Sequence, residues 1–272
     1  MNRKLIAMDL DGTTVDSEGR LPVRVREAIR AARTAGHVVA FVSGRGDTDM
    51  IPIDKECQDV DYIILNNGAK VIRGSDRTVL HNDLLNQDGV DRLVNFCLEH
   101  GLQVYLINGR EWYVNRWSRR LQNYIDKLGY GPIYFERVDQ LPLHHIEGLT
   151  VMGNTRQVCS FVNEGSFGLR AVVSEEECAD ILNQGTDKWR GIEKLLDLLI
   201  MDPEDVIAVG NYENDLEMIS RAGIGVAVGN AIDCVKSRAD YVTVRDNDQG
   251  AVADMINQLV LQREEGLCVK TN

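Results

Sequence analysis

The sequence predicts an α/β fold, in which a Rossmann-like, doubly wound parallel-sheet core carries an inserted α+β domain. Three observations predict it. Short apolar runs alternate with amphipathic segments over residues 1–84, the pattern becomes antiparallel in character over residues 85–185, and the alternation returns over residues 186–272. We therefore expect residues 1–84 and 186–272 to form one core, and residues 85–185 to form the insertion.

The first core segment contains three expected strands, at residues 5–8, 38–42 and 61–65, with a helix over residues 22–35. The helix begins with a proline, which suits a first helical turn, and a glycine follows its last residue. Each strand stops abruptly at polar residues. Because doubly wound sheets bind ligands at the carboxyl ends of their strands, these polar residues predict where a site lies.

The insertion reads as a small α+β domain. A helix is expected over residues 89–100, a hairpin with an Asn-Gly turn over 102–115, and a second helix over 117–128. Strands are expected near 145–152 and 168–174, with a helix between them. We assign no substrate-binding role to the conspicuous aromatic and basic residues of the insertion. We expect the two tryptophans to pack in its interior, and the two adjacent histidines, on a strand, to point to opposite faces. The conspicuous residues are Trp112, Trp117, Arg119, Arg120, His144 and His145.

The second core segment resumes the strand–helix alternation. We expect helices over residues 189–200, 214–222 and 249–263, and a further helix after residue 230. Strands are expected at 206–209, 224–228 and 241–244, and a frayed polar tail follows the last helix.

Composition limits the classes of function. The 272 residues carry 42 acids against 30 bases, a net charge of −12, which argues against nucleic-acid and anionic-membrane surfaces. No apolar run approaches the roughly 18 residues of a membrane span, and no signal peptide is recognised. Six cysteines without a Cys-X-X-Cys pair predict reduced thiols. We expect a cytoplasmic protein with a small-molecule partner, no nucleic acid and no membrane, as a monomer or weak homodimer.

The end of the first strand carries the sharpest signal. Asp9 and Asp11 are two residues apart, so both carboxylates start on the same side of the strand end, and Gly12 permits a tight turn there. Two facing carboxylates repel each other unless a proton or a cation lies between them. A calcium loop is excluded, because its required Gly and Glu positions are occupied by Thr14 and Arg20.

Four clusters at strand ends or helix starts together supply what phosphoryl transfer needs. Asp9 can attack phosphorus, and Asp11 can protonate the leaving oxygen and then activate water. A cation must lie between Asp9 and the phosphate, and hard oxygen ligands favour Mg²⁺. Singly, each cluster is more often a turn, a solvated charge or a helix cap. The clusters are Asp9–Thr13, Ser43–Arg45, Lys188 and Gly210–Asp215.

In this order the motifs resemble the haloacid-dehalogenase superfamily, in its Cof-type, sugar-phosphatase-like branch. The matching stretches are Asp9-Leu-Asp-Gly-Thr13, Val42-Ser-Gly-Arg45, Asn67-Gly-Ala69, Lys188 and Gly210-Asn-Tyr-Glu-Asn-Asp-Leu-Glu-Met218, and the later stretch Gly225-Val-Ala-Val-Gly-Asn-Ala231 is also similar to the family. The resemblance implies a large α/β cap in the insertion and Mg²⁺-dependent hydrolysis of phosphate monoesters. It also implies Asp9 as nucleophile and Asp11 as general acid and base. Phosphate binding falls to Leu10, Ser43, Gly44, Lys188 and Asn214, and metal binding to Asp9, Asp11, Asn211 and Asp215.

One position departs from the family pattern. Asn211 stands where the family usually has a metal-binding Asp, so an uncharged amide oxygen replaces a carboxylate, while Asp215 remains. We hypothesise weakened Mg²⁺ affinity at an active site. The favoured substrate is a sugar phosphate, and pyridoxal phosphate or a flavin nucleotide is an alternative. A phosphosugar mutase and a non-catalytic protein that binds phosphorylated metabolites are the competing functions.

Overall fold

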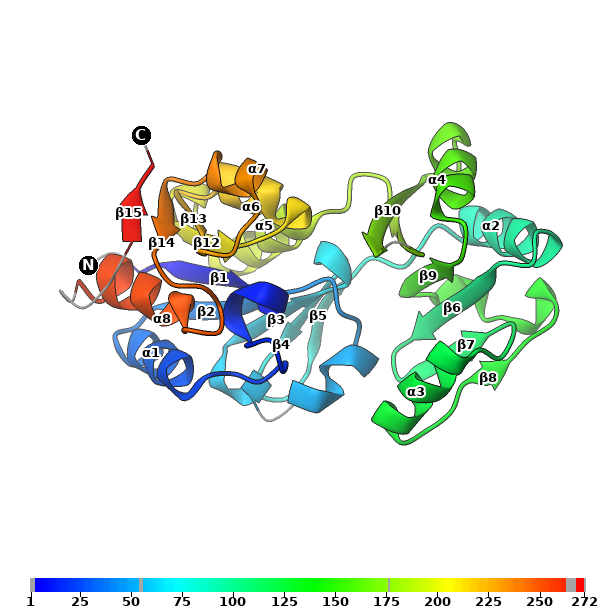
Figure 1. Cartoon of the computed structure of the whole chain (residues 1–272), viewed down its shortest axis with the longest axis horizontal. Coiled ribbons are helices and arrows are strands. Elements are labelled where there is room, and N and C mark those ends of the chain that lie inside the picture. The colour runs from blue at the N-terminus through cyan, green and yellow to red at the C-terminus, as the bar shows by residue number, and fades with distance from the viewer. Residues whose placement is uncertain (1–2, 54–55, 176, 263–267, 272) are drawn as a thin grey trace. The chain divides into compact units, whose positions relative to one another are not determined.

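The computed structural model describes residues 3–53, 56–175, 177–262 and 268–271, and the chain divides into two compact units. We call residues 1–44, 52–81 and 187–272 the core unit, and residues 45–51 and 82–186 the inserted unit (Figure 1). The sequence placed residues 45–51 in the core. In the structure they group with the insertion, because the Tyr124 hydroxyl donates a hydrogen bond to Asp49 Oδ1 and lies 3.2 Å from Thr48 Oγ1.

The core sheet has strand order β15-β14-β13-β12-β1-β2-β3-β4-β5. The six strands from β14 to β3 run parallel, whereas β15 and β4 pair antiparallel with their neighbours. Every residue of β1, β2 and β12 is buried, as expected for strands covered on both faces. This confirms the predicted fold class. The strands are β1 Leu5–Asp9, β2 Val38–Val42, β3 Tyr62–Leu65, β4 Lys70–Arg73, β5 Val79–Asn82, β12 Val206–Gly210, β13 Ile224–Ala227, β14 Tyr241–Thr243 and β15 Cys268–Lys270.

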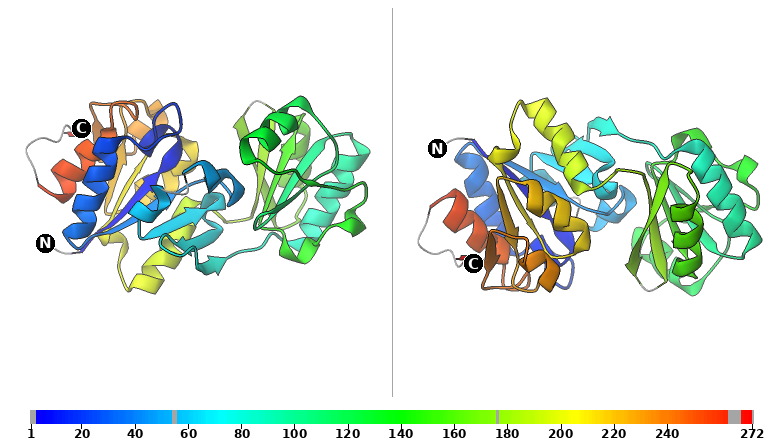
Figure 2. Two further views of the ribbon diagram at one scale, coloured as in Figure 1. Left: turned by 90° about the horizontal axis from the view of Figure 1, so that it is seen from below. Right: turned by 90° about the horizontal axis from the view of Figure 1, so that it is seen from above.

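Helices cover both faces of this sheet. Helices α1 (Val23–Thr34) and α8 (Ala251–Met255) lie side by side on one face, and α5 (Lys188–Leu199) and α6 (Leu216–Arg221) lie on the other (Figures 1 and 2). The short helix α7 (Asp233–Lys236) follows β13. In α1 the buried residues recur at helical spacing, so one apolar stripe faces the sheet: they are Val25, Ala28, Ile29 and Ala32.

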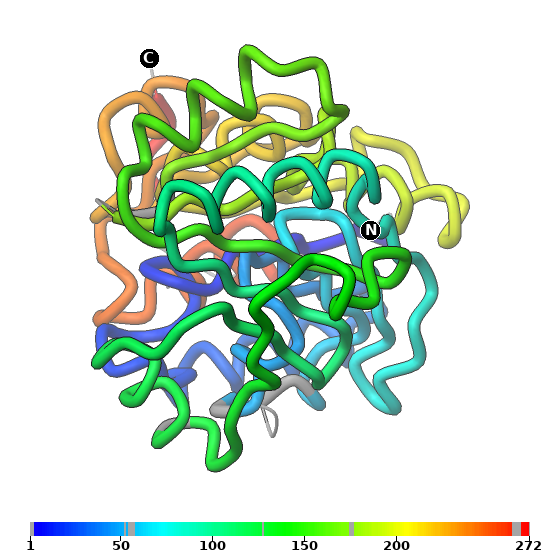
Figure 3. Tube along the Cα trace, turned by 90° about the vertical axis from the view of Figure 1, so that its right-hand side faces the viewer, coloured from blue at the N-terminus to red at the C-terminus, as the bar shows by residue number. Residues whose placement is uncertain are grey.

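The inserted unit is built on a six-stranded sheet of order β10-β11-β9-β6-β7-β8. Helices α2 (Gln87–Glu99) and α4 (Thr155–Glu164) run side by side (Figure 3), and Phe96 of α2 stacks on Phe161 of α4 with ring centroids 3.9 Å apart. Their buried side chains form one core with the sheet. The strands are β6 Gln103–Asn108, β7 Glu111–Val114, β8 Ile133–Tyr134, β9 Gly148–Met152, β10 Leu169–Glu175 and β11 Cys178–Asn183.

Helix α3 (Arg119–Leu128) packs on a separate cluster around Trp112. This confirms the packing role predicted for Trp112, but the same prediction is wrong for Trp117, whose surface is 61% exposed. The strand predicted at His144 and His145 is also wrong. Those residues end a short 3₁₀ turn, and their rings lie 4.3 Å apart.

Short strands account for most other differences from the predicted elements. The sequence did not predict β4, β5, β8 or β11, and the tail expected to fray pairs with β14 as β15. The last predicted helix divides into α8 and a π-type segment at Ile256–Val260. Cysteines 97, 159, 178, 234 and 268 are not in disulfide bonds. None of the helices in the described residues has the length and apolar character that a membrane crossing requires.

The start of α5 approaches the loop after β3 very closely. A Cβ atom built on Gly191 would lie 2.5 Å from Ile64 Cγ2 and 2.8 Å from Gly68 Cα. Gly68 has φ +104°, and a Cβ there would lie 2.0 Å from the Asp187 carbonyl oxygen. The two glycines therefore let the helix N-terminus, and with it Lys188, approach the ends of the strands.

We predict that Gly191→Ala destabilises the protein by about 1–3 kcal/mol, because the added methyl group overpacks a contact made largely of backbone. Thermal unfolding followed by circular dichroism measures this as a fall of several degrees in Tm. Gly131→Ala is the matched control, since no atom lies within 4 Å of its built Cβ. Equal Tm values for the two variants would contradict the close-approach argument.

Candidate active site

The predicted site residues gather at the carboxyl edge of the core sheet. Strand β1 ends at Asp9, which pairs in register with Val42 of β2, so Ser43 emerges beside it. On the other side Met8 pairs with Val209 of β12, which brings the loop after Gly210 to the same level. Parallel pairing of three neighbouring strands thus assembles segments that lie far apart in the sequence.

A buried ion-paired triad forms the centre of the site. Lys188 Nζ lies 2.5 Å from Asp9 Oδ1 and 2.6 Å from Asp215 Oδ1. The exposed fractions of these residues are 1% for Lys188, 5% for Asp9 and 0% for Asp215. Buried charges are tolerated only when they are paired, so each member of the triad depends on the others.

The triad shifts the protonation of its members. Burial raises the pKa of Asp9 to about 7; the Asp215 charge acts in the same direction, and Lys188 opposes both. For Lys188 burial alone would lower the pKa, but the Asp215 and Asp9 carboxylates outweigh burial and raise it above its ordinary value. Lys188 is therefore a permanent cation, and Asp9 is a carboxylate whose ionised form needs further positive charge nearby.

Asp215 also organises the loop after β12. Its Oδ2 accepts hydrogen bonds from the backbone N–H groups of Asn211, at 2.8 Å, and Tyr212, at 3.0 Å. A Cβ on Gly210 would lie 2.4 Å from the Asp215 carboxyl carbon, so only glycine leaves room for this fold-back. Both carboxylate oxygens of Asp215 are thus engaged, one by Lys188 and one by the loop.

The remaining oxygen atoms fit a hard divalent cation. Asp9 Oδ2 is buried and has no hydrogen-bond partner among the described residues. Asn211 Oδ1 lies 3.1 Å from the Thr13 hydroxyl, which donates to it, so this amide oxygen faces the turn after Asp9. No group of three His, Cys, Asp or Glu side chains in the described ranges could hold a metal. A cation would therefore rely on the Asp9 carboxylate, an amide oxygen and backbone carbonyls, ligands that suit Mg²⁺.

A second set of contacts joins Ser43, Gly44 and Asn214 through Asn67. The Asn67 N–H donates to the Ser43 carbonyl at 3.0 Å, and Asn67 Oδ1 accepts from Asn214 Nδ2 at 3.1 Å. A Cβ on Gly44 would come within 3.1 Å of the Asn67 amide. Asn67 is buried with φ +51°, a left-handed conformation that Asn tolerates better than most residues.

The sequence motifs include Asn67 but predict no site role for it. The Asn-Asn-Gly run at a strand end was the available signal. The other predicted residues lie on the same edge: Leu10 is buried, Ser43 is buried, and Asp11 is exposed on the turn after β1. The structure therefore brings the predicted residues together in two groups. One is the ion-paired triad, and the other consists of two loops that the Asn67 side chain and backbone connect.

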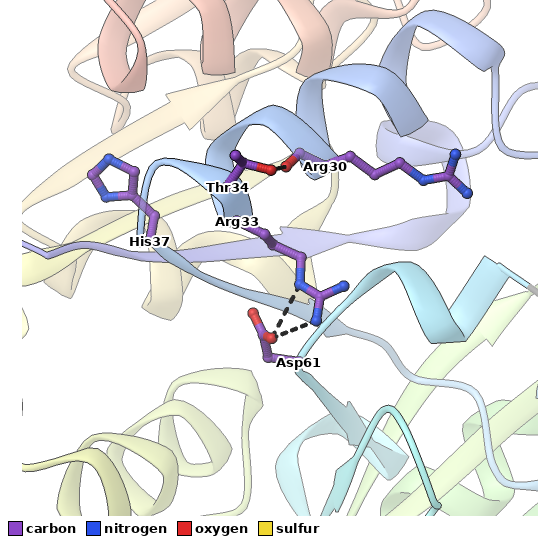
Figure 4. A pocket seen from close by; sticks show the side chains of 5 residues that line it. All are labelled: Arg30, Arg33, Thr34, His37 and Asp61. Atoms are coloured by element: carbon purple, nitrogen blue, oxygen red, sulfur yellow. Dashed lines mark hydrogen bonds and ion pairs between the residues drawn. The ribbon is translucent and has the colours of Figure 1, made fainter.

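A separate hollow lies where the core strands begin, at the opposite ends of the strands from Asp9. It is lined by residues at the end of α1, by His37 before β2 and by Asp61 before β3 (Figure 4). Its charges are paired, since Arg33 lies 2.8 Å from Asp61 and Arg30 lies 2.8 Å from Asp59. The hollow is therefore a set of surface ion pairs rather than a second candidate active site.

Comparison with known proteins adds a family match over most of the chain. The model of the haloacid dehalogenase-like hydrolase family matches residues 6–256. The chain is similar to 5-amino-6-(5-phospho-D-ribitylamino)uracil phosphatase YwtE of Bacillus subtilis, at 26% identity over 94% of this chain and 98% of that protein. It is also similar to pyridoxal phosphate phosphatase YbhA of Escherichia coli, at 26% identity over 94% of this chain and 98% of that one.

The fold agrees with solved structures. A haloacid dehalogenase-like hydrolase from Bacteroides thetaiotaomicron superimposes with a TM-score of 0.83 at 26% identity, and the match covers 95% of this chain and 100% of the other. The predicted resemblance, including the Cof-type branch, is confirmed.

We predict that Asp9 makes the chelator-treated protein less stable as the pH rises. Its folded pKa of about 7 exceeds the ordinary 3.8, so its contribution to stability is full below about pH 4 and is lost as the pH rises through 7. Each pKa unit corresponds to about 1.4 kcal/mol, or about 2–4 °C in Tm for a chain of this size. In EDTA, Tm should fall more between pH 5 and pH 8 in the wild type than in Asp9→Asn; parallel curves would contradict the raised pKa.

Proposed function

Because this chain is a phosphatase of the haloacid dehalogenase-like hydrolase family, we propose that it hydrolyses a small sugar phosphate with Mg²⁺ through an aspartyl-phosphate intermediate. The observation that carries the proposal is the buried triad: Lys188 holds Asp9 Oδ1 and leaves Asp9 Oδ2 without a hydrogen-bond partner among the described residues. A carboxylate held in this way presents one oriented oxygen as a nucleophile.

In the first step Asp9 Oδ2 attacks phosphorus. The new oxygen–phosphorus bond forms as the bond to the substrate's leaving oxygen breaks, and Asp11 gives its proton to that oxygen. In the second step Asp11, now a carboxylate, takes a proton from water, whose oxygen attacks the phosphorus. The bond to Asp9 then breaks, inorganic phosphate leaves, and both carboxyl groups regain their starting states.

Groups around the triad would hold the phosphoryl oxygens. The Ser43 hydroxyl, the Gly44 N–H and the Lys188 ammonium are donors suited to oxygens on which negative charge develops. Asn214 joins this set through Asn67, whose side-chain oxygen Oδ1 accepts a hydrogen bond from Asn214 Nδ2 at 3.1 Å. Asn67 thus extends the predicted phosphate-binding set as a residue that orients two of its members.

Mg²⁺ would supply the positive charge that lets Asp9 remain ionised beside a phosphate dianion. We assign its protein ligands to Asp9 Oδ1, the Asp11 carbonyl oxygen and the Asn211 amide oxygen, so that Asp9 Oδ2 stays available for the attack on phosphorus. Asp215 supports the site indirectly, because Lys188 and two backbone N–H groups already occupy its oxygens. With two neutral ligands among three, we infer a lower Mg²⁺ affinity than an acid at position 211 would give.

A sugar phosphate is the substrate class we favour. The similar phosphatase YwtE is named for a substrate whose phosphate is carried on a ribityl chain, and the net charge of −12 disfavours large polyanionic substrates. We assign catalysis to residues 1–84 and 186–272 and substrate selection to residues 85–185. We place the reaction in the cytoplasm, carried out by a monomer or weak homodimer.

We predict Mg²⁺-dependent phosphate release from a panel of sugar phosphates, pyridoxal phosphate and flavin mononucleotide. Asp9→Asn should lower turnover at least about 10⁴-fold, because it removes the nucleophile. The measurement is inorganic phosphate release, with chromatography of the organic product. A phosphoryl group that reappears on a second sugar hydroxyl would point instead to a mutase, and binding without any release would overturn the hydrolase proposal.

We predict that Asn211→Asp tightens Mg²⁺ binding about tenfold, since a charged ligand replaces a neutral one. Titrating Mg²⁺ against phosphate release measures the half-saturating concentration, and isothermal titration calorimetry measures binding without turnover. Asn163→Asp controls for adding one negative charge on an exposed helix position. An unchanged Mg²⁺ affinity in Asn211→Asp would remove Asn211 from the ligand set.

A further inference from the structure

The turn after β1 carries Asp11 at an exposed position. Residues 10–15 form one compact turn, closed by the Val15 N–H, which donates to the Leu10 carbonyl at 3.0 Å. The Thr14 hydroxyl donates to the Asp9 carbonyl at its start, and Gly12 has φ +72° at its middle. The location of the Asp11 carboxyl group therefore depends on what holds this turn against the rest of the core unit.

Three asparagines, each in the loop after a different core strand, hold the turn of residues 10–15. Asn211 follows β12, Asn230 follows β13 and Asn247 follows β14. Asn211 Oδ1 accepts from the Thr13 hydroxyl at 3.1 Å. Asn230 Nδ2 donates to the Gly12 carbonyl at 2.8 Å, and Asn247 Nδ2 donates to the Val15 carbonyl at 3.0 Å.

The last two asparagines also bond to each other. The backbone N–H of Asn247 donates to Asn230 Oδ1 at 3.1 Å, so the Asn230 amide uses its donor toward the turn and its acceptor toward the next loop. Asn247 is 8% exposed, so its contact with the Val15 carbonyl is buried. The amide side chain supplies both a donor and an acceptor here, whereas a carboxylate of the same shape would place an acceptor against the Gly12 carbonyl.

We propose that Asn230 and Asn247 are positioning residues that hold the Gly12–Val15 turn, and thereby keep Asp11 where it can pass its proton to the leaving oxygen. The proposal rests on the phosphatase mechanism proposed above. Neither residue touches the reacting atoms; both act through Asp11. Proton transfer needs donor and acceptor within about 2.6–3.2 Å, so a shift of about 1 Å in the turn can cost about 100-fold in rate.

The leaving group distinguishes this role from a general structural one. An alkyl ester such as a sugar phosphate leaves as an alkoxide that needs a proton, whereas p-nitrophenyl phosphate leaves as a stable phenolate that does not. We expect Asn230→Ala and Asn247→Ala to lower kcat/KM for the sugar phosphate about 10- to 100-fold. The same variants should lower kcat/KM for p-nitrophenyl phosphate less than about threefold. Because kcat/KM reports the steps up to transfer to Asp9, the later attack by water does not obscure the comparison.

Matched variants sharpen the test. Asn230→Asp should be as impaired as Asn230→Ala, because it loses the donor but keeps the shape. Asn163→Ala removes an exposed asparagine of α4 that accepts one backbone hydrogen bond from Ala171, at 3.1 Å, and should leave both substrates unaffected. Combining Asn230→Ala with Asp11→Asn should add little to Asp11→Asn alone, because both changes act through one carboxyl group.

Hydrogen–deuterium exchange gives a readout that needs no turnover. Asn230→Ala and Asn247→Ala should speed exchange in peptides covering residues 10–17 and leave α5 and β2 unchanged. Equal losses of kcat/KM for the two esters, or unchanged exchange in the turn, would overturn the positioning role while phosphatase activity stands. A wild-type protein inactive toward both esters would overturn the proposed function, and with it the catalytic part of this inference.

Discussion

A single buried ammonium sets the electrostatic balance of the core unit. Lys188 lies between Asp9 and Asp215, almost wholly shielded from water, and each carboxylate would be costly without it. Its place depends on the start of α5, which in turn depends on two glycines that let helix and loop touch. The charge balance of the triad therefore depends on the close packing between α5 and the loop after β3, and a change to either disturbs both.

Asparagine side chains make most of the other hydrogen bonds that hold the loops at the strand ends. Asn67 joins two loops, and Asn211, Asn230 and Asn247 hold the turn that follows Asp9. Carboxylates could accept similar hydrogen bonds, but they would add negative charge to a site that already holds three acids and is expected to receive a phosphate. Asparagine satisfies backbone donors and acceptors in fixed geometry without that repulsion.

The sequence predicted the architecture well where the hydrophobic signal was continuous. The buried runs of β1, β2 and β12 and the apolar stripe of α1 carry clear hydrophobic patterns. The motifs after β1 and β12 and at the start of α5 located Asp9, Asp215 and Lys188. Strands β4, β5, β8, β11 and β15 were missed, because a strand with a mixed or short pattern is specified by its neighbours rather than by its own residues. The segment that forms β15 has no hydrophobic pattern of its own that would predict a strand.

The contacts between the site residues were harder to predict than the identity of those residues. Spacing placed Asp215 near the metal, but its partners, Lys188 and two backbone N–H groups, appear only once the loop folds back over Gly210. The bridging place of Asn67 and the contacts of Asn230 and Asn247 depend on the lateral order of strands in the sheet. A single sequence, read along its length, does not contain that order.

The grouping of residues 45–51 with the inserted unit bears on how the two units could be recombined. The chain enters the inserted unit twice, first for a short loop directly after Gly44 and again for the long segment from residue 82. Transplanting the long segment alone from a relative would leave Thr48 and Asp49 facing a foreign surface in place of Tyr124. A chimera of two such proteins, or a natural exchange between them, would therefore have to carry both pieces together.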